Sequence, residues 1–191
     1  MDRDFWQGLY ASGDTRFDLG GPVPALLDWL AATAPAPGKA VVPGCGRGYD
    51  VNELARRGWD ALGVDLAPTA IRDARSGGAG RFLEADFFTV PPEPCDLFFE
   101  NTFYCAIAPS RRDEYARAAA RWVVPGGTLL FVAFPVGAHE GGPPFAIAAD
   151  ELAPRFAANF TLEALTQPRP SLPRRAGREW LAVFRRKVVS P

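Results

Sequence analysis

A glycine-rich turn between two apolar segments constrains this chain more than any other feature. The stretch 41–50 reads Val-Val-Pro-Gly-Cys-Gly-Arg-Gly-Tyr-Asp, which predicts a strand that turns at Gly44, Gly46 and Gly48 into a helix. Glycine lets a backbone turn tightly and approach a ligand closely, and the first turn of a helix offers unpaired N–H groups. The turn therefore predicts a small-molecule site at the end of the first strand.

An acid follows at the spacing that a nucleotide site requires. The stretch 61–65 predicts a second short strand that ends in Asp65, 21 residues after Gly44. In a doubly wound sheet such an acid lies beside the ribose of a bound nucleotide. The dinucleotide fingerprint needs a third glycine at position 49, where this chain has Tyr49. The pattern G-x-G-x-G followed by this acid is instead typical of S-adenosylmethionine-dependent methyltransferases.

Length and composition exclude several classes of protein. A chain of 191 residues suits one domain, 1–191, and its formal net charge of −1 offers no field for gripping nucleic acid. No run approaches about 18 apolar residues and the first residues are acidic and polar, so we expect a cytoplasmic protein without a signal peptide or membrane span. Three cysteines and a single histidine, His139, predict reduced thiols and no metal site.

The segment 1–21 is dense in aromatic residues. Phe5, Trp6, Leu9 and Tyr10 fall on one face of an expected helix. Two interpretations stay open: a helix packed onto the sheet, or an amino-terminal lid that folds aromatic side chains over the ligand.

Beyond the turn, strand and helix patterns alternate, which predicts a parallel sheet. We expect further strands at 81–88, 95–100 and 128–134, helices at 68–75 and 109–122, and a short helix at 150–156. The last two strands, 160–165 and 179–184, have no crossover helix between them and should be antiparallel. Because ligand sites lie beyond the carboxyl ends of parallel strands, residues 101–104, from Asn101 to Tyr104, should line the pocket.

With these segments placed, the chain resembles the thiopurine S-methyltransferase family, which includes plant and bacterial thiol and halide methyltransferases. The resemblance runs through most of the chain and rests on Phe5-Trp6 with Tyr10, Gly13-Asp14-Thr15, Phe17-Asp18-Leu19-Gly20, Val42-Pro43-Gly44-Cys45-Gly46, Gly48-Tyr49-Asp50-Val51, Asp65-Leu66-Ala67, Asp86-Phe87-Phe88, Thr102-Phe103, Cys105-Ala106-Ile107 and Gly142-Pro143-Pro144-Phe145. It implies an α/β class I methyltransferase fold: a Rossmann-like three-layer sandwich with a seven-stranded, mostly parallel sheet and an antiparallel last strand. It also implies S-adenosyl-L-methionine as the methyl donor.

The resemblance assigns a role to individual positions. It implies that Trp6 and Tyr10 stack against the donor, Gly44 and Gly46 lie under its methionine part, Asp65 takes the ribose hydroxyls, Asp86 and Phe87 flank the adenine, and Arg112 lies near the acceptor. We add Phe17 and Asn101 to the donor-binding residues, because Phe17 could attract the sulfonium by cation–π interaction and Asn101 follows the fourth expected strand, where the pocket should open.

The expected activity is transfer of the donor's methyl group to a small nucleophile, the sulfur of a thiol or a halide or selenide. Catalytic candidates are Arg112, Asp18 and Tyr104, beside an apolar pocket of Phe17, Phe103 and Phe145. Arg112, with Arg174 or Arg175, would favour an anionic acceptor; the alternative is that all three are solvated surface charges.

Two other functions stay open: a non-catalytic sensor of the donor or its product, and an NAD-dependent oxidoreductase, against which Tyr49 argues. Expected partners are small-molecule substrates, with no nucleic acid and no membrane, and the chain is expected to act as a monomer.

Overall fold

The computed structural model describes residues 2–148 and 150–188. The chain divides into two compact units, Met1–Pro91 and Pro92–Pro191, called the first and the second unit below. The expectation of a single domain over 1–191 stays a prediction.

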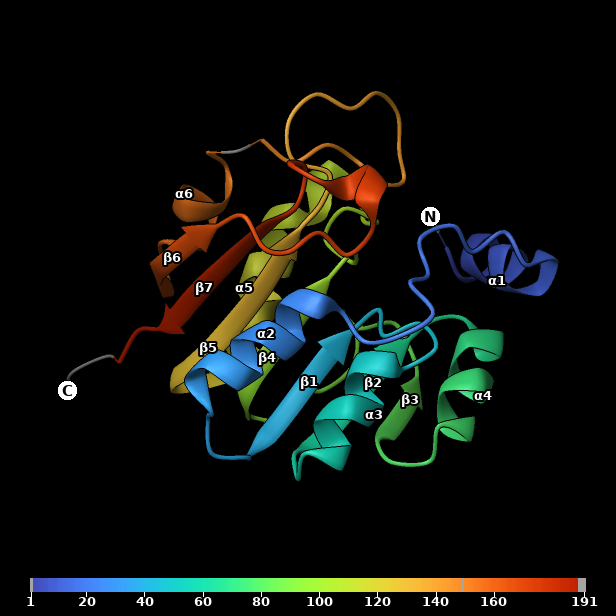
Figure 1. Cartoon of the computed structure of the whole chain (residues 1–191), viewed down its shortest axis with the longest axis horizontal. Helices are drawn as coiled ribbons and strands as arrows, with labels where there is room; N and C mark the ends of the chain where they lie inside the picture. The colour runs from blue at the N-terminus through green and yellow to red at the C-terminus, as the bar shows by residue number, and fades with distance from the viewer. Residues whose placement is uncertain (1, 149, 189–191) are drawn as a thin grey trace. The chain divides into compact units, whose positions relative to one another are not determined.

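The first unit is built on three parallel strands, β1 (Lys39–Pro43), β2 (Asp60–Asp65) and β3 (Arg81–Glu84), in the order β3-β2-β1 (Figure 1). Strands β1 and β2 are buried along most of their length, as expected for parallel strands covered on both faces. Pro43 pairs with Val64 and Asp65 pairs with Glu84, so the carboxyl ends of the three strands meet at one edge.

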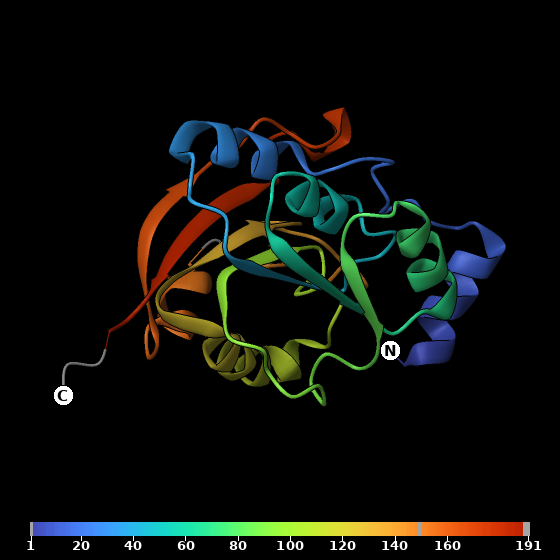
Figure 2. The ribbon, with the colours of Figure 1, turned by 90° about the horizontal axis from the view of Figure 1, so that it is seen from below.

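Four helices accompany this sheet: α1 (Arg3–Ser12), α2 (Pro24–Thr33), α3 (Tyr49–Arg56) and α4 (Pro68–Ser76). The Asp2 side chain caps α1 by accepting a hydrogen bond from the N–H of Phe5 at 3.1 Å, and both α2 and α4 begin at a proline, whose missing N–H costs nothing there. Helix α3 packs against β1 and β2, α4 packs against β2 and β3, and α1 lies beside α4 (Figure 2). The amino-terminal helix thus packs on another helix.

The second unit holds β4 (Cys95–Asn101), β5 (Val123–Ala133), β6 (Phe160–Thr166) and β7 (Trp180–Arg186) in the order β4-β5-β7-β6. Strand β4 is parallel to β5, whereas β7 is antiparallel to both of its neighbours. A 3₁₀ turn, η1 (Pro109–Arg111), leads into α5 (Arg112–Trp122); α6 (Leu152–Phe156) precedes β6, and η2 (Pro173–Arg175) lies between β6 and β7.

Aromatic rings fill the core of the second unit. Tyr115 and Trp122 lie on the buried face of α5, seven positions apart as helical periodicity requires. The Phe156 ring of α6 lies 5.8 Å from the Phe131 ring and 5.1 Å from the Phe184 ring, centroid to centroid. Edge-to-face and tilted pairs of this kind add to the stabilisation from burial alone. The short helix α6 is therefore held in place by its buried side chains, Phe156 with Leu152.

The described residues form seven strands, and the last is antiparallel, as predicted. Two boundaries were wrong by four residues or more. Strand β3 ends at Glu84, not at 88, because the Asp86 side chain accepts a hydrogen bond from the N–H of Phe88 at 3.0 Å and turns the chain. Strand β5 begins at Val123, not at 128, because Val123 pairs with Cys95 ahead of a register shift in β4.

A buried acid organises the turn that follows β4. The Glu100 side chain has no exposed area. One carboxylate oxygen accepts from the N–H of Phe103 at 2.9 Å and of Tyr104 at 2.8 Å, and the other accepts from the Tyr115 hydroxyl at 2.5 Å. Burial raises the pKa of Glu100 to about 7, against the opposing effect of these three donors.

Glu100→Gln should change how stability depends on pH. Between the ordinary glutamate pKa and about 7, the folded wild type keeps a proton that the unfolded chain has lost, so its free energy of unfolding should fall as pH rises through this window. The expected slope approaches about 1.4 kcal/mol per pH unit. Urea unfolding from pH 4 to 8 measures it, and the variant should lack most of the decline. Glu93→Gln, at an exposed loop position, is the control; an unchanged slope in Glu100→Gln would contradict the assignment.

Candidate functional site

The glycine turn after β1 is held by its own backbone. The N–H of Cys45 donates to the carbonyl of Val64 at 3.2 Å, and the N–H of Gly48 donates to the carbonyl of Cys45 at 2.9 Å. Gly46 and Gly48 have φ of 53° and 71°, a backbone conformation that residues other than glycine rarely adopt. A Cβ on Gly48 would lie 2.5 Å from the Phe82 ring, so the turn is also packed too closely for a side chain.

Asp65 ties this turn to the next loop. One of its carboxylate oxygens accepts from the N–H of Gly46 and the other from the N–H of Ala67, both at 2.9 Å. Its backbone carbonyl accepts from the N–H of Ala85 at 3.0 Å, which adds the end of β3 to the same group. Burial raises the pKa of Asp65, while the N–H donors stabilise the ionised form and oppose that rise. One residue, through its carboxylate and its backbone carbonyl, therefore ties together the ends of all three parallel strands.

Two further predicted donor-binding residues, Asp86 and Phe87, follow the end of β3. The Asp86 carboxylate caps the turn that follows the strand, and its backbone carbonyl accepts from the N–H of Thr89 at 2.9 Å. The Phe87 side chain is buried and packs against Phe88 with 5.7 Å between ring centroids. Both residues thus lie at the same sheet edge as Asp65.

Three aromatic residues of the segment 1–21 form one cluster. Tyr10 is buried against Ala67 and Ala70, and Trp6 and Phe17 pack on the same group. The Phe17 ring lies 5.9 Å from the Trp6 ring and 5.5 Å from the Tyr10 ring, both edge to face. The predicted grouping of these three side chains is therefore present in the first unit.

Tyr10 reaches the glycine turn directly. A Cβ on Gly46 would lie 2.8 Å from the Tyr10 hydroxyl oxygen, closer than real Cβ contacts allow. Burial, and then the charge of Asp65, raise the pKa of Tyr10, so the ring stays neutral in physiological solution. Only glycine at position 46 lets the aromatic segment approach the turn this closely.

Sequence reasoning missed Arg47, which joins the turn to the segment 1–21. Its guanidinium donates to the Asp18 carboxylate, to the Thr15 hydroxyl at 3.3 Å and to the Asp73 carboxylate at 3.2 Å. A basic residue between two turn glycines, with acids upstream, was the available signal. Asp18, a catalytic candidate, is thus an ion-pair partner here, and its carboxylate also accepts from the N–H of Gly20 at 2.8 Å.

Gln7 and Thr69 fasten α1 to the start of α4. The Gln7 side chain donates to the Thr69 hydroxyl at 2.8 Å and accepts from the Thr69 N–H at 3.0 Å. That N–H belongs to the first turn of α4 and has no partner within the helix. The pair therefore caps α4 from another element, a contact that no local pattern predicts.

S-adenosyl-L-methionine fits the residues at this edge of the first unit. A glycine at position 46 leaves backbone without a side chain, and a carboxylate has about four acceptor positions, of which Gly46 and Ala67 use two on Asp65. Aromatic faces of Trp6, Tyr10 and Phe17 suit a sulfonium cation. The individual assignments of these residues to parts of the donor stay predictions.

In the second unit, Asn101 ends β4 and is the remaining donor-binding candidate. Its side-chain oxygen is buried and has no hydrogen-bond partner among the described residues. A buried acceptor left unsatisfied costs about 1–3 kcal/mol, so such groups often await a ligand or water. The following residue, Thr102, has φ of 62°, and the preceding Glu100 holds this turn.

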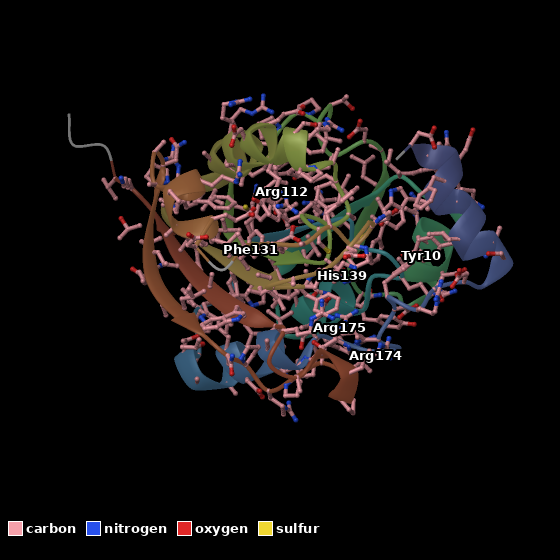
Figure 3. The ribbon with its side chains drawn as sticks, turned by 90° about the horizontal axis from the view of Figure 1, so that it is seen from above. Tyr10, Arg112, Phe131, His139, Arg174 and Arg175 are labelled. Atoms are coloured by element: carbon pink, nitrogen blue, oxygen red, sulfur yellow. The ribbon has the colours of Figure 1, made fainter. Side chains whose placement is uncertain are left out.

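The catalytic candidates Tyr104 and Arg112 meet at Glu151. The Tyr104 hydroxyl donates to the Glu151 carboxylate at 2.6 Å, and Arg112 donates to both of its oxygens at 3.0 and 3.1 Å. The other Arg112 terminal nitrogen donates to the carbonyl of Ala146 at 2.8 Å, and its guanidinium carbon lies 4.7 Å from the Tyr104 ring centroid. Arg112 projects from α5 into this network and is 4% exposed (Figure 3).

Arg175 is likewise a buried residue, 2% exposed, in the loop between β6 and β7. It pairs with Glu179 at 3.3 Å and lies over the Phe134 ring at 4.4 Å from the centroid. The alternative that Arg112 and Arg175 are solvated surface charges was therefore wrong, because both side chains are buried and pair with Glu151 and Glu179 inside the second unit. Arg174, the neighbour of Arg175 in Figure 3, is exposed. That any of the three faces an acceptor stays a prediction.

His139 contacts an arginine, and burial disfavours the thiolate form of the cysteines. The Nδ1 atom of His139 lies 3.3 Å from an Arg178 nitrogen, and burial raises the pKa of both Cys95 and Cys105 to about 12. The described residues contain no group of three or more His, Cys, Asp or Glu that could hold a metal ion. Nor does any described helix have the length and apolar character to cross a membrane.

Comparison with known proteins supports one family. The family model for thiopurine S-methyltransferase (TPMT) matches residues 1–189. The Arabidopsis thaliana protein "Probable thiol methyltransferase 2" is 34% identical over 154 residues, which cover 76% of this chain and 68% of the relative. "Thiocyanate methyltransferase 1" of Brassica oleracea is 30% identical over 193 residues, covering 95% of this chain and 84% of the relative.

A solved structure shows the same fold. The 1,6-didemethyltoxoflavin-N1-methyltransferase of Burkholderia thailandensis, solved with S-adenosylhomocysteine and 1,6-didemethyltoxoflavin, matches with a TM-score of 0.75 at 23% identity, covering 98% of this chain and 87% of that one. The predicted α/β class I methyltransferase fold is confirmed.

Asp65→Asn should loosen the turn and weaken donor binding. An amide offers one oxygen, so either Gly46 or Ala67 would face an NH₂ group in place of an acceptor. We expect the Kd for S-adenosylhomocysteine to rise by tenfold or more, since a hydrogen bond to a charged group contributes about 1.5–3 kcal/mol. Calorimetry measures it. Asp60→Asn, at the exposed opposite end of β2, is the control; wild-type affinity in Asp65→Asn would remove Asp65 from the site.

Arg112→Met should destabilise the protein by about 3 kcal/mol in urea unfolding, because Glu151 would lose its closest cation. Replacing Glu151 by Met as well should recover part of this loss. The control is Arg111→Met, which breaks a half-exposed pair with Glu114 and should cost less than about 1 kcal/mol. If Arg112→Met keeps wild-type stability but raises KM for anionic acceptors only, the arginine acts on the acceptor and not on this network.

Proposed function

The chain belongs to the thiopurine S-methyltransferase family, and on that premise we propose that its methyl acceptor is a small, soft, easily ionised nucleophile, with a thiol first and a halide, thiocyanate or selenide next. The observation that carries the proposal is this membership over nearly the whole chain, together with the relatives named as a thiol and a thiocyanate methyltransferase. The chain is an S-adenosylmethionine-dependent methyltransferase. The acceptor is the part that we propose.

The titratable groups of the second unit support an acceptor that brings its own charge. Burial, and then the Glu151 carboxylate, raise the pKa of Tyr104. Burial, and then the charge of Glu100, raise the pKa of Tyr115. Both hydroxyls therefore remain protonated at neutral pH and already donate to carboxylates. Neither tyrosine can act as a general base, and an acceptor that ionises by itself requires none.

The methyl donor, when bound, supplies an electrophilic methyl group on a sulfonium, so the protein's task is alignment. Correct positioning of two reactants can contribute about 7–11 kcal/mol toward a barrier. In our proposal Asp65 and the glycine turn hold the donor, and Trp6, Tyr10 and Phe17 present aromatic faces to its sulfonium and exclude water. Asp18, Tyr104 and Arg112 then act as positioning residues, since each is held by a specific partner.

The two alternative functions receive no support from the relatives. Neither an NAD-dependent oxidoreductase nor a non-catalytic sensor is named among the relatives reported above, which are methyltransferases. We further propose that the protein acts in the cytoplasm as a monomer and on small molecules, not on nucleic acid, in keeping with its formal net charge of −1.

A panel of acceptors tests the proposal. Purified protein with labelled S-adenosylmethionine should methylate small thiols, and the pH at which kcat/KM levels off should follow the pKa of each thiol, because the thiolate is the reactive species. For a thiol whose pKa is one unit lower, kcat/KM should therefore level off at a pH about one unit lower.

Halide and thiocyanate, which are charged at every pH used, are the internal control and should show no such rise. Efficient methylation of an amine or a catechol with no turnover of thiols, thiocyanate or halides would refute the proposed acceptor. A pH profile that is the same for every thiol would show that a protein group, and not the acceptor, titrates.

A further inference from the structure

Arg47 belongs to the glycine turn, but its side chain hydrogen-bonds residues that lie outside that turn. It lies between Gly46 and Gly48, yet its head group contacts two other elements of the first unit: Thr15 and Asp18 in the segment that follows α1, and Asp73 on α4. The side chain is 26% exposed and that of Asp18 is 12% exposed, so the Arg47–Asp18 pair is largely removed from solvent. Screening by water, which weakens surface pairs, is reduced at such a place.

Arginine suits this position for a geometric reason. Its planar head presents five N–H donors, and here it contacts two carboxylates and a hydroxyl on two separate elements. A lysine would keep the positive charge, but its ammonium lacks the planar set of N–H donors that the guanidinium directs at several partners.

The same side chain supports the aromatic cluster. The Arg47 guanidinium carbon lies 5.6 Å from the Tyr10 ring centroid, and the Tyr10 hydroxyl occupies the space beside Gly46. Tyr10 in turn packs on Phe17, which directly precedes Asp18. The turn, the aromatic cluster and the acid that holds Arg47 thus form one contiguous group of contacts.

The segment held by Arg47 has little structure of its own. Between α1 and α2 there is neither helix nor strand, and the stretch is bounded by Gly13 and Gly20, both with positive φ of 77° and 72°. Its contacts within 13–21 are short-range, such as the N–H of Asp18 donating to the carbonyl of Thr15 at 2.8 Å. Glycines at both ends allow such a segment to move as a unit once its outside contacts are released.

We propose that Arg47 is a positioning residue that latches the segment 13–21 onto the glycine turn and thereby sets the affinity for the methyl donor. Release of the Arg47–Asp18 pair would free Phe17 and Tyr10 together, so the turn and the aromatic cluster would lose their fixed relation. The inference concerns the donor and is independent of the proposed acceptor.

Arg47→Met keeps the apolar stem and removes the donors, and Asp18→Asn removes the charge from the other side. Each should raise the Kd for S-adenosylhomocysteine by about tenfold in calorimetry, and the KM for S-adenosylmethionine should rise in parallel. The double variant should bind no more weakly than Arg47→Met alone, because that single change already removes the pair with Asp18. Arg47→Lys should lie between wild type and Arg47→Met.

Limited proteolysis measures, without any ligand, whether the segment 13–21 is released from the glycine turn. The Arg16 side chain is 88% exposed and lies within the latched segment, so trypsin cleavage after Arg16, followed by mass spectrometry, reports its release. Cleavage there should be about tenfold faster in Arg47→Met and Asp18→Asn than in wild type. The matched control is Arg72→Met, which removes the other arginine that pairs with Asp73 and should leave both Kd and cleavage rate unchanged.

Two results would overturn the proposal: wild-type Kd and cleavage rate in both variants, or weaker binding with an unchanged cleavage rate, which would mean that Arg47 acts on the turn alone. If Arg47→Met fails to fold, Asp18→Asn decides by the same two measurements. Binding of S-adenosylhomocysteine by wild type without turnover of any thiol, thiocyanate or halide would count against the proposed acceptor and leave the latch standing.

Discussion

The first unit depends on one carboxylate that accepts hydrogen bonds from two loops. Gly46 and Ala67 lie on different connections, and each would leave an N–H without a partner if Asp65 were absent. An amide could serve only one of them, which explains why an acid is required in a place where burial disfavours its charge. Because these bonds exist in the protein alone, the edge at which we propose that the donor binds is formed in advance, and binding there would not have to order two loops.

The sequence was sufficient where the signals are local. Glycine spacing, the acid at the end of β2 and proline at the start of α4 each follow from a few neighbouring residues, and the structure has them where predicted. It was insufficient where a role depends on distant partners. Arg47 meets residues 29 and 32 positions away, and Arg112 meets Glu151 at 39 positions. Nothing in the spacing of such residues distinguishes a solvated arginine from one buried against an acid.

The aromatic segment shows why the two interpretations of it were hard to separate. Side chains of α1 and of the stretch after it pack on Ala67 and Ala70 at the start of α4, so the segment contributes to the core of the first unit. The Tyr10 ring of the same cluster lies beside Gly46, in the turn that we propose binds the donor. A segment can therefore be structural and close to a site at once, and its hydrophobic pattern alone carries no information on which role dominates.

The short helix α6 depends on contacts outside itself. A helix of five residues cannot persist by itself, since nucleation alone outweighs the few hydrogen bonds it forms. Its buried side chains Leu152 and Phe156 anchor it, and the Phe156 ring lies beside Phe131 of β5 and Phe184 of β7. Glu151, immediately before α6, accepts hydrogen bonds from Tyr104 and Arg112. The polar network around Glu151 therefore relies on the hydrophobic packing of the helix next to it, so the ionic and aromatic parts of the second unit are not independent of each other.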